Sequence, residues 1–365
     1  MTTNVVHVLE DFSLSSGGLR TVVKELNERL LENGINSVII STRCEEEDDI
    51  ILVKGGSVPW RYSSNLVDEI KRLHTNKKID LIHIHGVWMY PQYISAKYAF
   101  NNNIPYIITC HGMLEPWLWT KGKFKKEQYF KRIVYQYFNS ANYLHAITPL
   151  EAKELKKLFP KSKIKVIPNL ISIESPFKAN LSFENKYILY LGRLDEKKGI
   201  DILIKAFSNL EDKNIRLKIA GEFNEYKNEL AKIADDLNIL ERVDFVGLVK
   251  GKEKEKLYRE AFVFVAPSHS EVIGMVNLEA AKNQTPVITT YQTGLLKDWN
   301  KNGGVLINPS ENNLFSELSK AVSWSRSERN LRGQKLRDFV EKEYSWDTKI
   351  KDWIGFYKTT ANEIK

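Results

Sequence analysis

Cysteine is scarce in this sequence: only Cys44 and Cys110 occur among 365 residues. The two do not form a CxxC pair, and no group of cysteines and histidines has the spacing of a zinc site. A framework of disulfides is therefore not expected. Free cysteines are typical of proteins that stay in a reducing compartment, so we expect a cytoplasmic protein.

Long apolar runs are also missing. No segment approaches the roughly 20 apolar residues that a membrane-spanning helix needs. The first residues, Met1 to Glu10, lack the basic stretch and the apolar core of a signal peptide. The expected location is the cytoplasm, and attachment to the inner face of the cytoplasmic membrane stays open.

Three motifs that identify familiar chemistry are absent. There is no GxGxxG and no GxxxxGKS/T, which disfavours a dinucleotide-dependent dehydrogenase and a P-loop NTPase. There is no Asp-x-Asp, and the acidic run from Glu45 to Asp49 is interpreted as a solvated loop. Because no paired carboxylates are evident that would hold a divalent cation, we expect no metal and no cofactor requirement.

The residues that are present give a net charge of +8, with 42% apolar and 27% charged residues. This composition is typical of a globular protein, and the length suits two domains better than one. A basic balance favours anionic partners such as phosphorylated small molecules, an acidic membrane surface or nucleic acid. Since no nucleic-acid-binding module accompanies the charge, nucleic acid is not expected as a partner.

Apolar strands alternate with amphipathic helices from the N-terminus onward. A strand at 5–9, a turn from Ser15 to Gly18, a helix that Asn33-Gly34 ends and a strand at 37–41 form a βαβ unit. Further strands are predicted at 81–85, 106–111, 141–147 and 164–167, and a helix at 123–138. This alternation predicts a parallel sheet with helices on both faces.

The periodicity fails between Leu170 and Asn185, where we place a linker. A second series then begins, with helices predicted at 199–210 and 226–237 and strands at 187–191, 216–220, 243–246, 262–265, 286–290 and 304–307. The predicted fold class is α/β, with two doubly wound, Rossmann-like domains at residues 1–172 and 173–344. The helix expected at about 345–365 either caps its own domain or packs back on the first.

In open parallel sheets, ligands bind at the carboxyl ends of the strands. That rule selects candidates from both halves of the chain, and two domains facing each other would line one cleft with them. The candidates are Gly17, Gly18, His85, His111, Gly192, Arg193, Gly221 and the segment from Ser268 to Glu279.

The segment from Glu271 to Glu279 follows a predicted strand and enters a helix near Gly274. Free amides at a helix start can hold an anion. The helical rise gives a separation of about 10 Å between the two glutamates. Glycosidase carboxylate pairs are closer, at roughly 5–9.5 Å, so this pair suits the two ends of a longer ligand, such as sugar and ribose hydroxyls. Two exposed glutamates without a ligand are the alternative.

Arg193 and Lys198 lie in a loop between a predicted strand and the helix that begins at Gly199. A guanidinium and an ammonium could clamp a diphosphate and stabilise it as it departs. The alternative is a solvated basic loop. Gly17 and Gly18 would let backbone amides approach a phosphate or an acceptor closely, although a Gly-Gly turn alone is a weak signal.

His85 and His111 each end a strand and precede a glycine. Either could donate a hydrogen bond beside a reacting sugar, but a lone histidine is more often structural. Strand alternation places His83 on the same face as His85.

The segment from Lys121 to Arg132 is basic, with Phe124, Tyr129 and Phe130 interleaved. It could lie on an anionic membrane surface, where a lipid-linked acceptor would reside. The preferred interpretation is an ordinary helix with an apolar stripe toward the core and a wet basic face.

In their order along the chain, these motifs resemble glycosyltransferase family 4, which has the GT-B fold of two Rossmann-like domains. The resemblance covers nearly the whole chain and rests on Gly17-Gly18, His111-Gly112, Ile167-Pro168-Asn169, Gly192 to Gly199, Glu271 to Glu279 and Thr285 to Ile288. The stretch from His111 to Trp117 resembles enzymes of bacterial surface-polysaccharide assembly. The chain departs from the usual pattern at Leu170, Ile273 and Gln284, where the family has Gly, Phe and Gly.

The resemblance implies a retaining, metal-independent transfer of a hexose-type sugar from a UDP- or GDP-linked donor to a glycan or lipid-linked acceptor. Arg193 and Lys198 would bind the donor diphosphate, and Glu279 the ribose. Glu271 and His111 would lie against the donor sugar, so the catalytic roles fall to these two and to Arg193 and Lys198. The rest of the donor site would comprise the backbone amides of Gly274, Met275 and Val276 with Gly17, Gly18 and Gly221, and His85 would lie on the acceptor side.

Two alternatives stay open. One is a GT-B epimerase that converts free nucleotide-sugar without an acceptor. The other is a non-catalytic subunit that binds sugar or membrane. The presence of both cations and both glutamates favours catalysis.

Overall fold

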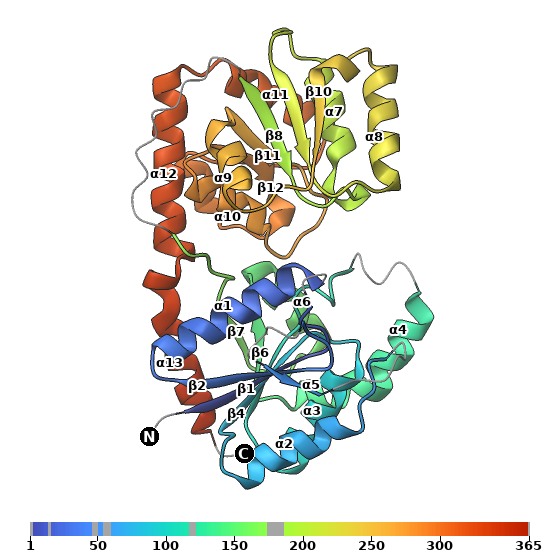
Figure 1. Cartoon of the computed structure of the whole chain (residues 1–365), viewed down its shortest axis with the longest axis vertical. Coiled ribbons are helices and arrows are strands. Elements are labelled where there is room, and N and C mark those ends of the chain that lie inside the picture. Colours follow the sequence, from blue (N-terminus) through green and yellow to red (C-terminus); the bar gives the residue numbers. More distant parts are fainter. Residues whose placement is uncertain are drawn as a thin grey trace. The chain divides into compact units, whose positions relative to one another are not determined.

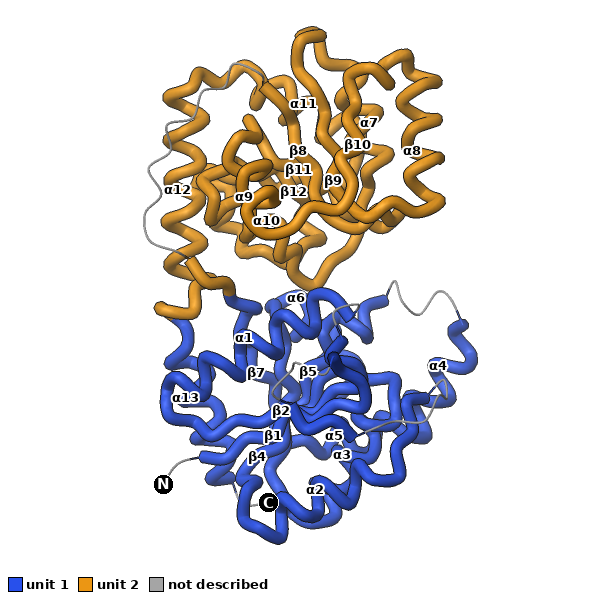
Figure 2. The backbone as a smooth tube through the Cα atoms, viewed as in Figure 1, with its two compact units in different colours: residues 1–170, 349–365 blue, residues 171–348 orange. Residues whose placement is uncertain are grey.

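The computed structural model describes residues 3–13, 16–45, 50–53, 60–116, 122–173 and 186–363. The chain divides into two compact units: unit 1 is residues 1–170 with 349–365, and unit 2 is residues 171–348 (Figures 1 and 2). Several predictions fall on residues outside the described ones: most of the expected linker, most of the acidic run, Ser15, Trp117 and Lys121.

Unit 1 is built on a parallel sheet of seven strands in the order β3-β2-β1-β4-β5-β6-β7. The strands are β1 (Asn4–Leu9), β2 (Asn36–Ser41), β3 (Ile51–Leu52), β4 (Leu81–His85), β5 (Tyr106–Thr109), β6 (Tyr143–Ala146) and β7 (Ile164–Val166). β1 pairs with both β2 and β4, so that Val6 stands beside Val38 and Ile82. The strand order reverses between β1 and β4, which is the switch point where ligands bind in such sheets.

Helices cover both faces of this sheet (Figure 1). On one face, Val23 of α1 (Gly18–Glu32) packs with Leu9 and Ile39, and the C-terminal α13 (Trp346–Ala361) lies against the same face through ring contacts with His83 and His145. On the other face, α2 (Asn65–Thr75), α3 (Tyr90–Asn101) and α6 (Pro149–Leu158) pack on the main core. The layered α/β arrangement is the one that the alternating pattern predicted.

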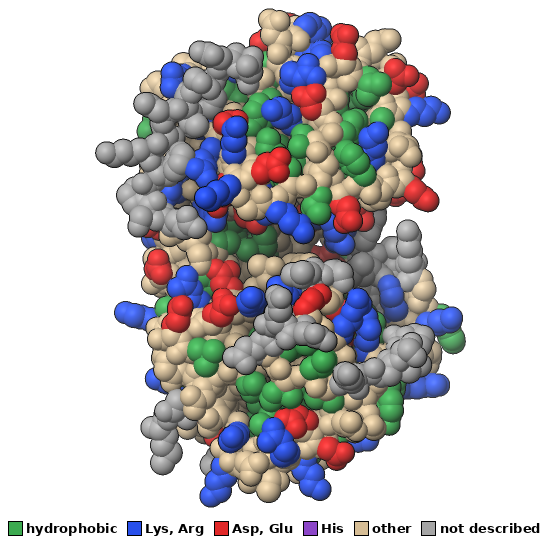
Figure 3. Space-filling view, viewed as in Figure 1, with side chains coloured by type: hydrophobic (Ala, Val, Ile, Leu, Met, Phe, Trp, Pro, Cys, Tyr) green, Lys and Arg blue, Asp and Glu red, His purple; other side chains and the backbone are tan. Residues whose placement is uncertain are grey.

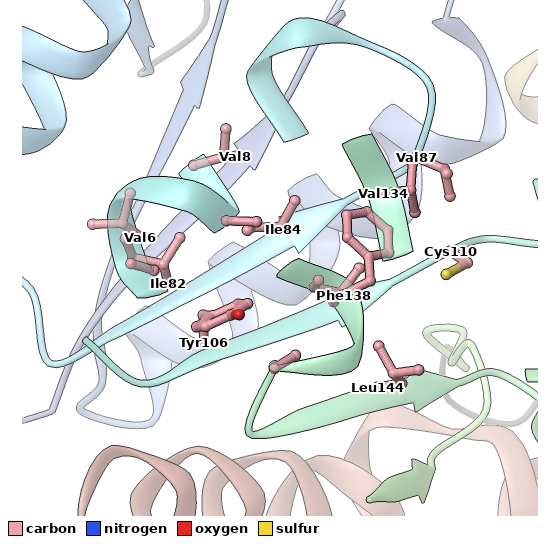
Figure 4. Close-up of a cluster of buried hydrophobic side chains, with 14 of the residues drawn as sticks. Val6, Val8, Ile82, Ile84, Val87, Tyr106, Cys110, Val134, Phe138 and Leu144 are labelled. Carbon is pink, nitrogen blue, oxygen red and sulfur yellow. The ribbon is translucent and has the colours of Figure 1, made fainter. Parts of the chain in front are cut away.

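The main core of unit 1 comes from every second residue of the central strands (Figure 4). Val6, Ile82 and Ile84 are 0% exposed and lie with Tyr106 and Phe138 between the sheet and its helices. β-branched and aromatic residues suit a sheet that is buried on both faces. Each such side chain contributes about 1.5–3 kcal/mol on burial, so the core holds the strand ends in place for function.

The helix predicted at 123–138 is present, with one π-helical turn inside it. It consists of α4 (Lys123–Tyr129), the π-helical turn (Phe130–Val134) and α5 (Tyr135–Asn139). Phe130, Val134 and Phe138 are buried, whereas Phe124 is 74% exposed. The spacing of the three buried residues confirms the apolar stripe toward the core.

Unit 2 has a parallel sheet of six strands in the order β10-β9-β8-β11-β12-β13. The strands are β8 (Tyr187–Leu191), β9 (Arg216–Ala220), β10 (Val243–Gly247), β11 (Val263–Ala266), β12 (Val287–Thr290) and β13 (Val305–Ile307). The helices are α7 (Ile200–Ser208), α8 (Glu225–Asp236), α9 (Gly251–Glu260), α10 (Met275–Lys282), α11 (Glu311–Val322) and α12 (Arg326–Tyr344). Here the order reverses between β8 and β11, so the loops that follow these two strands flank the second switch point.

No helix among the described residues has the length and apolar character needed to cross a membrane. On the face drawn in Figure 3, Lys and Arg side chains are interspersed with Asp and Glu on each unit.

Candidate active site

Lys198 and Glu271 meet at the switch point of unit 2. Lys198 lies in the loop after β8, and Glu271 lies in the loop after β11. Nζ of Lys198 is 2.6 Å from Oε1 of Glu271, and the hydroxyl of Ser268 donates to the same oxygen at 2.9 Å. The two charged side chains are only 17% and 13% exposed. Their attraction is therefore less screened by water than that of a surface pair.

A glycine allows these two loops to approach each other. Gly199 has φ +65°, and a Cβ there would clash with the carbonyl oxygen of Pro267. Directly beside it, the backbone N–H of His269 donates to the carbonyl of Lys197 at 2.8 Å. Glycine is thus required at 199 both for its backbone conformation and for the close approach.

The same two loops lead into the start of α10. The helix begins at Met275, with Gly274 as its N-cap, and no side chain caps it. A Cβ built on Gly274 would lie 3.4 Å from Oε2 of Glu271, so the carboxylate lies beside the helix start. The predicted helix start near Gly274 is confirmed. The uncapped first turn, with the amides of Met275 and Val276, provides donors for an anion.

Glu279 is held by residues that the sequence did not suggest. Nζ of Lys254 lies 2.7 Å from its carboxylate, and the hydroxyl of Tyr258 donates to it at 2.9 Å. Both partners come from α9 and are therefore brought to Glu279 only by the tertiary fold. Burial raises the pKa of Tyr258 well above its usual value, which keeps this phenol a hydrogen-bond donor. Glu271 and Glu279 thus have different partners, from different elements of unit 2.

Arg193 and Gly221 also lie at the carboxyl end of the unit 2 sheet. Arg193 is exposed, and its carbonyl accepts a 2.7 Å hydrogen bond from the hydroxyl of Tyr190. Gly221 is buried, and a Cβ there would clash with the carbonyl of Gly192. Packing between neighbouring loops thus explains the glycine at 221, and its predicted donor contact stays a prediction.

Gln284, where the family pattern has Gly, has a backbone conformation that favours glycine. Gln284 has φ +58°, a conformation that glycine adopts at less cost. At this position the chain therefore combines a backbone conformation that favours glycine with a larger side chain. Ile273, the departure next to Gly274, is 8% exposed and so belongs to the core.

In unit 1, Gly17 and Gly18 form the start of α1. Gly17 has φ +70° and is the N-cap, and the first turn carries neither a side-chain cap nor an acidic residue. The first turn thus offers backbone amides, and their contact with a phosphate or an acceptor oxygen stays a prediction.

His85 is buried, and its predicted place on the acceptor side stays a prediction. It is 1% exposed, and both of its ring nitrogens have partners. Its Nε2 lies 2.9 Å from Nδ1 of His7, and its Nδ1 lies 3.0 Å from Nε2 of His111. His85 thus lies behind His111, which is partly buried and has an unusual φ of +50°.

A second buried chain of hydrogen bonds runs across the same face of the sheet. His83 lies 2.7 Å from the hydroxyl of Tyr357 and 2.7 Å from that of Thr109. His145 lies 2.8 Å from the hydroxyl of Thr109 and 2.8 Å from the carbonyl oxygen of Ile167. The predicted shared face of His83 and His85 is confirmed, since their ring centroids are 4.0 Å apart.

Burial keeps these histidines neutral. It lowers the pKa of His7 and of His111 to about 3 and that of His145 to about 4. The ligand nitrogens of His7, His83 and His85 lie within 4.8 Å of one another, close enough for a metal ion. Both nitrogens of His83 and of His85 are already in hydrogen bonds, so a metal would have to displace those bonds.

Glu10 is a further candidate site residue, which sequence reasoning missed. It follows β1 directly, at the switch point of unit 1, and the amide of Gln92 donates to its carboxylate and, at 2.7 Å, to the carbonyl of His85. Burial raises the pKa of Glu10 above its usual value. The rule about carboxyl ends of strands, applied to β1, would have found it.

Comparisons with known proteins agree with this architecture. The profile "Glycosyl transferases group 1" matches residues 172–338, and the profile "Glycosyltransferase Family 4" matches residues 16–175. The chain is 30% identical over 303 residues to an uncharacterized glycosyltransferase of Methanocaldococcus jannaschii, which covers 77% of this chain and 75% of that protein. The chain therefore belongs to the group 1 glycosyltransferases, a class of enzymes that take the sugar from a nucleotide-sugar donor.

Two further likenesses extend over nearly the whole chain. An uncharacterized 41.2 kDa protein in the cps region of Klebsiella pneumoniae is 24% identical over 98% of this chain and 99% of that protein. The crystal structure of Anabaena Alr3699/HepE in complex with UDP and glucose has a TM-score of 0.75 at 14% identity, over 98% of this chain and 100% of that one. The fold is thus the GT-B fold of two Rossmann-like domains.

Proposed function

We propose that this enzyme is a retaining, metal-independent glycosyltransferase that moves a hexose-type sugar from a UDP- or GDP-linked donor to a glycan or lipid-linked acceptor. The observation that carries the proposal is the meeting of Lys198, Glu271 and the uncapped start of α10 at one switch point. A cation, a carboxylate and free amides in one place match a ligand that is anionic at one end and rich in hydroxyls at the other.

The donor diphosphate competes with Glu271 for Lys198. Without a ligand, the carboxylate neutralises the ammonium at 2.6 Å. A diphosphate at the start of α10 offers more negative charge, so Lys198 turns to it, and Arg193, which is exposed, joins it. Glu271 is then released toward the sugar hydroxyls. Ligand binding thus exchanges the partners of a pair that is already assembled.

The transfer needs no side chain as a base. The acceptor hydroxyl attacks the anomeric carbon from the face that the nucleotide leaves. The bond from that carbon to the diphosphate oxygen breaks, a bond to the acceptor oxygen forms, and a phosphate oxygen takes the acceptor's proton. Lys198, Arg193 and the amides of α10 stabilise the charge that grows on the leaving diphosphate.

Glu279 holds the ribose in this proposal. Lys254 and Tyr258 fix its carboxylate from α9, which orients the oxygens before the nucleotide arrives. The likeness to a solved structure that contains UDP and glucose supports a nucleotide-sugar as the donor.

The acceptor belongs to surface-polysaccharide assembly in this proposal. The likeness to a protein of a cps region supports it, as does the stretch that begins at His111. Phe124 is 74% exposed beside the lysines of α4, and this supports contact with an anionic membrane that carries a lipid-linked acceptor.

The test is a panel of UDP-, GDP- and other nucleotide-sugars. We expect at least one donor to raise the thermal stability of the protein and to be hydrolysed slowly without an acceptor. Addition of a chelator should leave this turnover unchanged, and the transferred sugar should keep the anomeric configuration of the donor, as read by NMR. Folded protein that binds no donor would refute the proposal, and conversion of the donor to its epimer would favour the epimerase.

A further inference from the structure

Three histidine rings of unit 1 form a chain of hydrogen bonds that ends at His111. Nδ1 of His7 in β1 lies 2.9 Å from Nε2 of His85 in β4, and Nδ1 of His85 lies 3.0 Å from Nε2 of His111. His7 and His85 are 0% and 1% exposed, so water does not interrupt the chain. The chain leads from the core of the sheet to its carboxyl edge.

The direction of one bond in this chain fixes the direction of the next. Burial lowers the pKa of all three rings far below neutral pH, so each ring carries a single ring proton. A neutral imidazole donates from one nitrogen and accepts at the other. If Nδ1 of His7 donates, then Nδ1 of His85 donates in turn, and His111 accepts at Nε2 and keeps its proton on Nδ1. In the opposite direction, His111 has a bare Nδ1.

The far end of the chain selects between the two directions. Nε2 of His7 is buried and has no hydrogen-bond partner among the residues that the structure describes. If the chain ran from His111 to His7, this nitrogen would carry a buried, unpaired N–H. If it runs from His7 to His111, the nitrogen only has an unused lone pair. Unpaired buried N–H groups are the rarer of the two in proteins, which favours the second direction.

We infer that His7 is a positioning residue that acts through His85 to keep the ring proton of His111 on Nδ1. His111 then presents an N–H donor to an oxygen at the carboxyl end of β5. The inference rests on the proposed function only in taking that oxygen to be a sugar hydroxyl. The left-handed backbone of His111, with φ +50°, is a second sign that this ring is held in a required place.

The neighbouring chain through His83 does not determine this tautomer. It runs from Tyr357 through Thr109 to His145 and ends at the carbonyl of Ile167. It therefore provides a control at the same depth in the same sheet.

The direct test is NMR of the full chain labelled with 15N-histidine and treated with a chelator. Long-range correlations between ring protons and ring nitrogens identify the protonated nitrogen, and a His111→Gln spectrum assigns the ring. We expect His111 to carry its proton on Nδ1. His7→Leu should lower that population, and His7→Asn should restore it, because the Asn amide nitrogen can replace the Nδ1–H. His145→Leu should leave the tautomer of His111 unchanged.

Two results would overturn the inference. One is a proton on Nε2 of His111 in the wild-type protein, a measurement that stands even if His7→Leu does not fold. The other is an unchanged tautomer in folded His7→Leu.

Turnover gives a second readout. With a donor identified, His7→Leu should lower kcat/KM by up to about tenfold, the size of one hydrogen bond, and His7→Asn should recover most of the loss. His74→Leu in α2 is the matched control, since His74 bonds to Tyr98 outside the chain. If the tautomer follows His7 but His111→Gln turns over normally, the inference holds and the sugar contact of the proposed function fails.

Discussion

At the residue scale, the charged side chains of the candidate site already have partners before any ligand binds. Lys198 is paired with Glu271, and Glu279 is paired with Lys254. Partly buried pairs of this kind are costly to assemble, and a cation that leaves its carboxylate needs another anion in its place, which a diphosphate would supply. This is why we assign them to ligand binding although each is also a structural contact.

Glu279→Gln tests the ribose contact. Loss of the carboxylate removes charge-assisted hydrogen bonds worth about 1.5–3 kcal/mol, so the nucleotide should bind roughly ten- to a hundredfold more weakly. Calorimetric titration with UDP and GDP measures this. Glu317→Gln on α11, whose carboxylate pairs with Lys320, removes the same charge from the surface and should not change binding. Equal affinity of wild type and Glu279→Gln would rule out the ribose contact.

At the element scale, the loops after β8 and β11 are positioned by a single close approach. Gly199 combines a positive φ with a clash for any Cβ, whereas Gly251 has φ +53° and open space around it. The two glycines therefore separate backbone strain from crowding.

Gly199→Ala should destabilise the protein by about 2–4 kcal/mol, the sum of left-handed strain and overpacking. Gly251→Ala should cost only about 1 kcal/mol, since it meets the strain alone. Urea denaturation of the two variants measures the difference. Equal losses would show that the contact with Pro267 does not hold the loops together.

Most strands could be predicted from the sequence, because the central strands of a parallel sheet are short apolar runs that turn residues bound. All of the predicted strands are present, some with ends shifted by one or two residues, but β3 has only two residues and was missed. Of the candidate site, only the residues that directly follow a predicted strand could be found from the sequence. Lys198 and Glu271 follow strand ends, whereas Lys254 and His7 reach their partners through tertiary packing that leaves no local signal.

At the scale of the whole molecule, the buried histidines make unit 1 sensitive to acid. The pKa of His7 and of His111 is lowered to about 3, so between this value and about 6.5 the unfolded chain binds protons that the folded chain does not. Stability therefore falls as pH falls through this window. Glu151 acts in the opposite sense, since burial raises its pKa to about 7, but it is outnumbered by four buried histidines and the partly buried His111, whose pKa values are all lowered.

Thermal unfolding at pH 6.5 and pH 5.5 checks this prediction. Each buried ring should cost roughly 1 kcal/mol over that interval. Replacing His145 by Phe removes one of these groups and should make the loss on acidification smaller by that amount. A protein whose stability does not change over this interval would show that these rings are not buried and neutral.

The central claim is that Lys198 binds the donor diphosphate. The adjacent Lys197 provides the sharpest comparison. Lys197 and Lys198 carry the same charge in the same loop, and Nζ of Lys198 lies 2.6 Å from the carboxylate of Glu271. The measurement is calorimetric titration of the best nucleotide-sugar into Lys198→Ala and Lys197→Ala. We predict that Lys198→Ala weakens binding by at least about tenfold, the loss of one charged hydrogen bond, while Lys197→Ala stays near wild type. Equal affinities in the two folded variants would contradict the account.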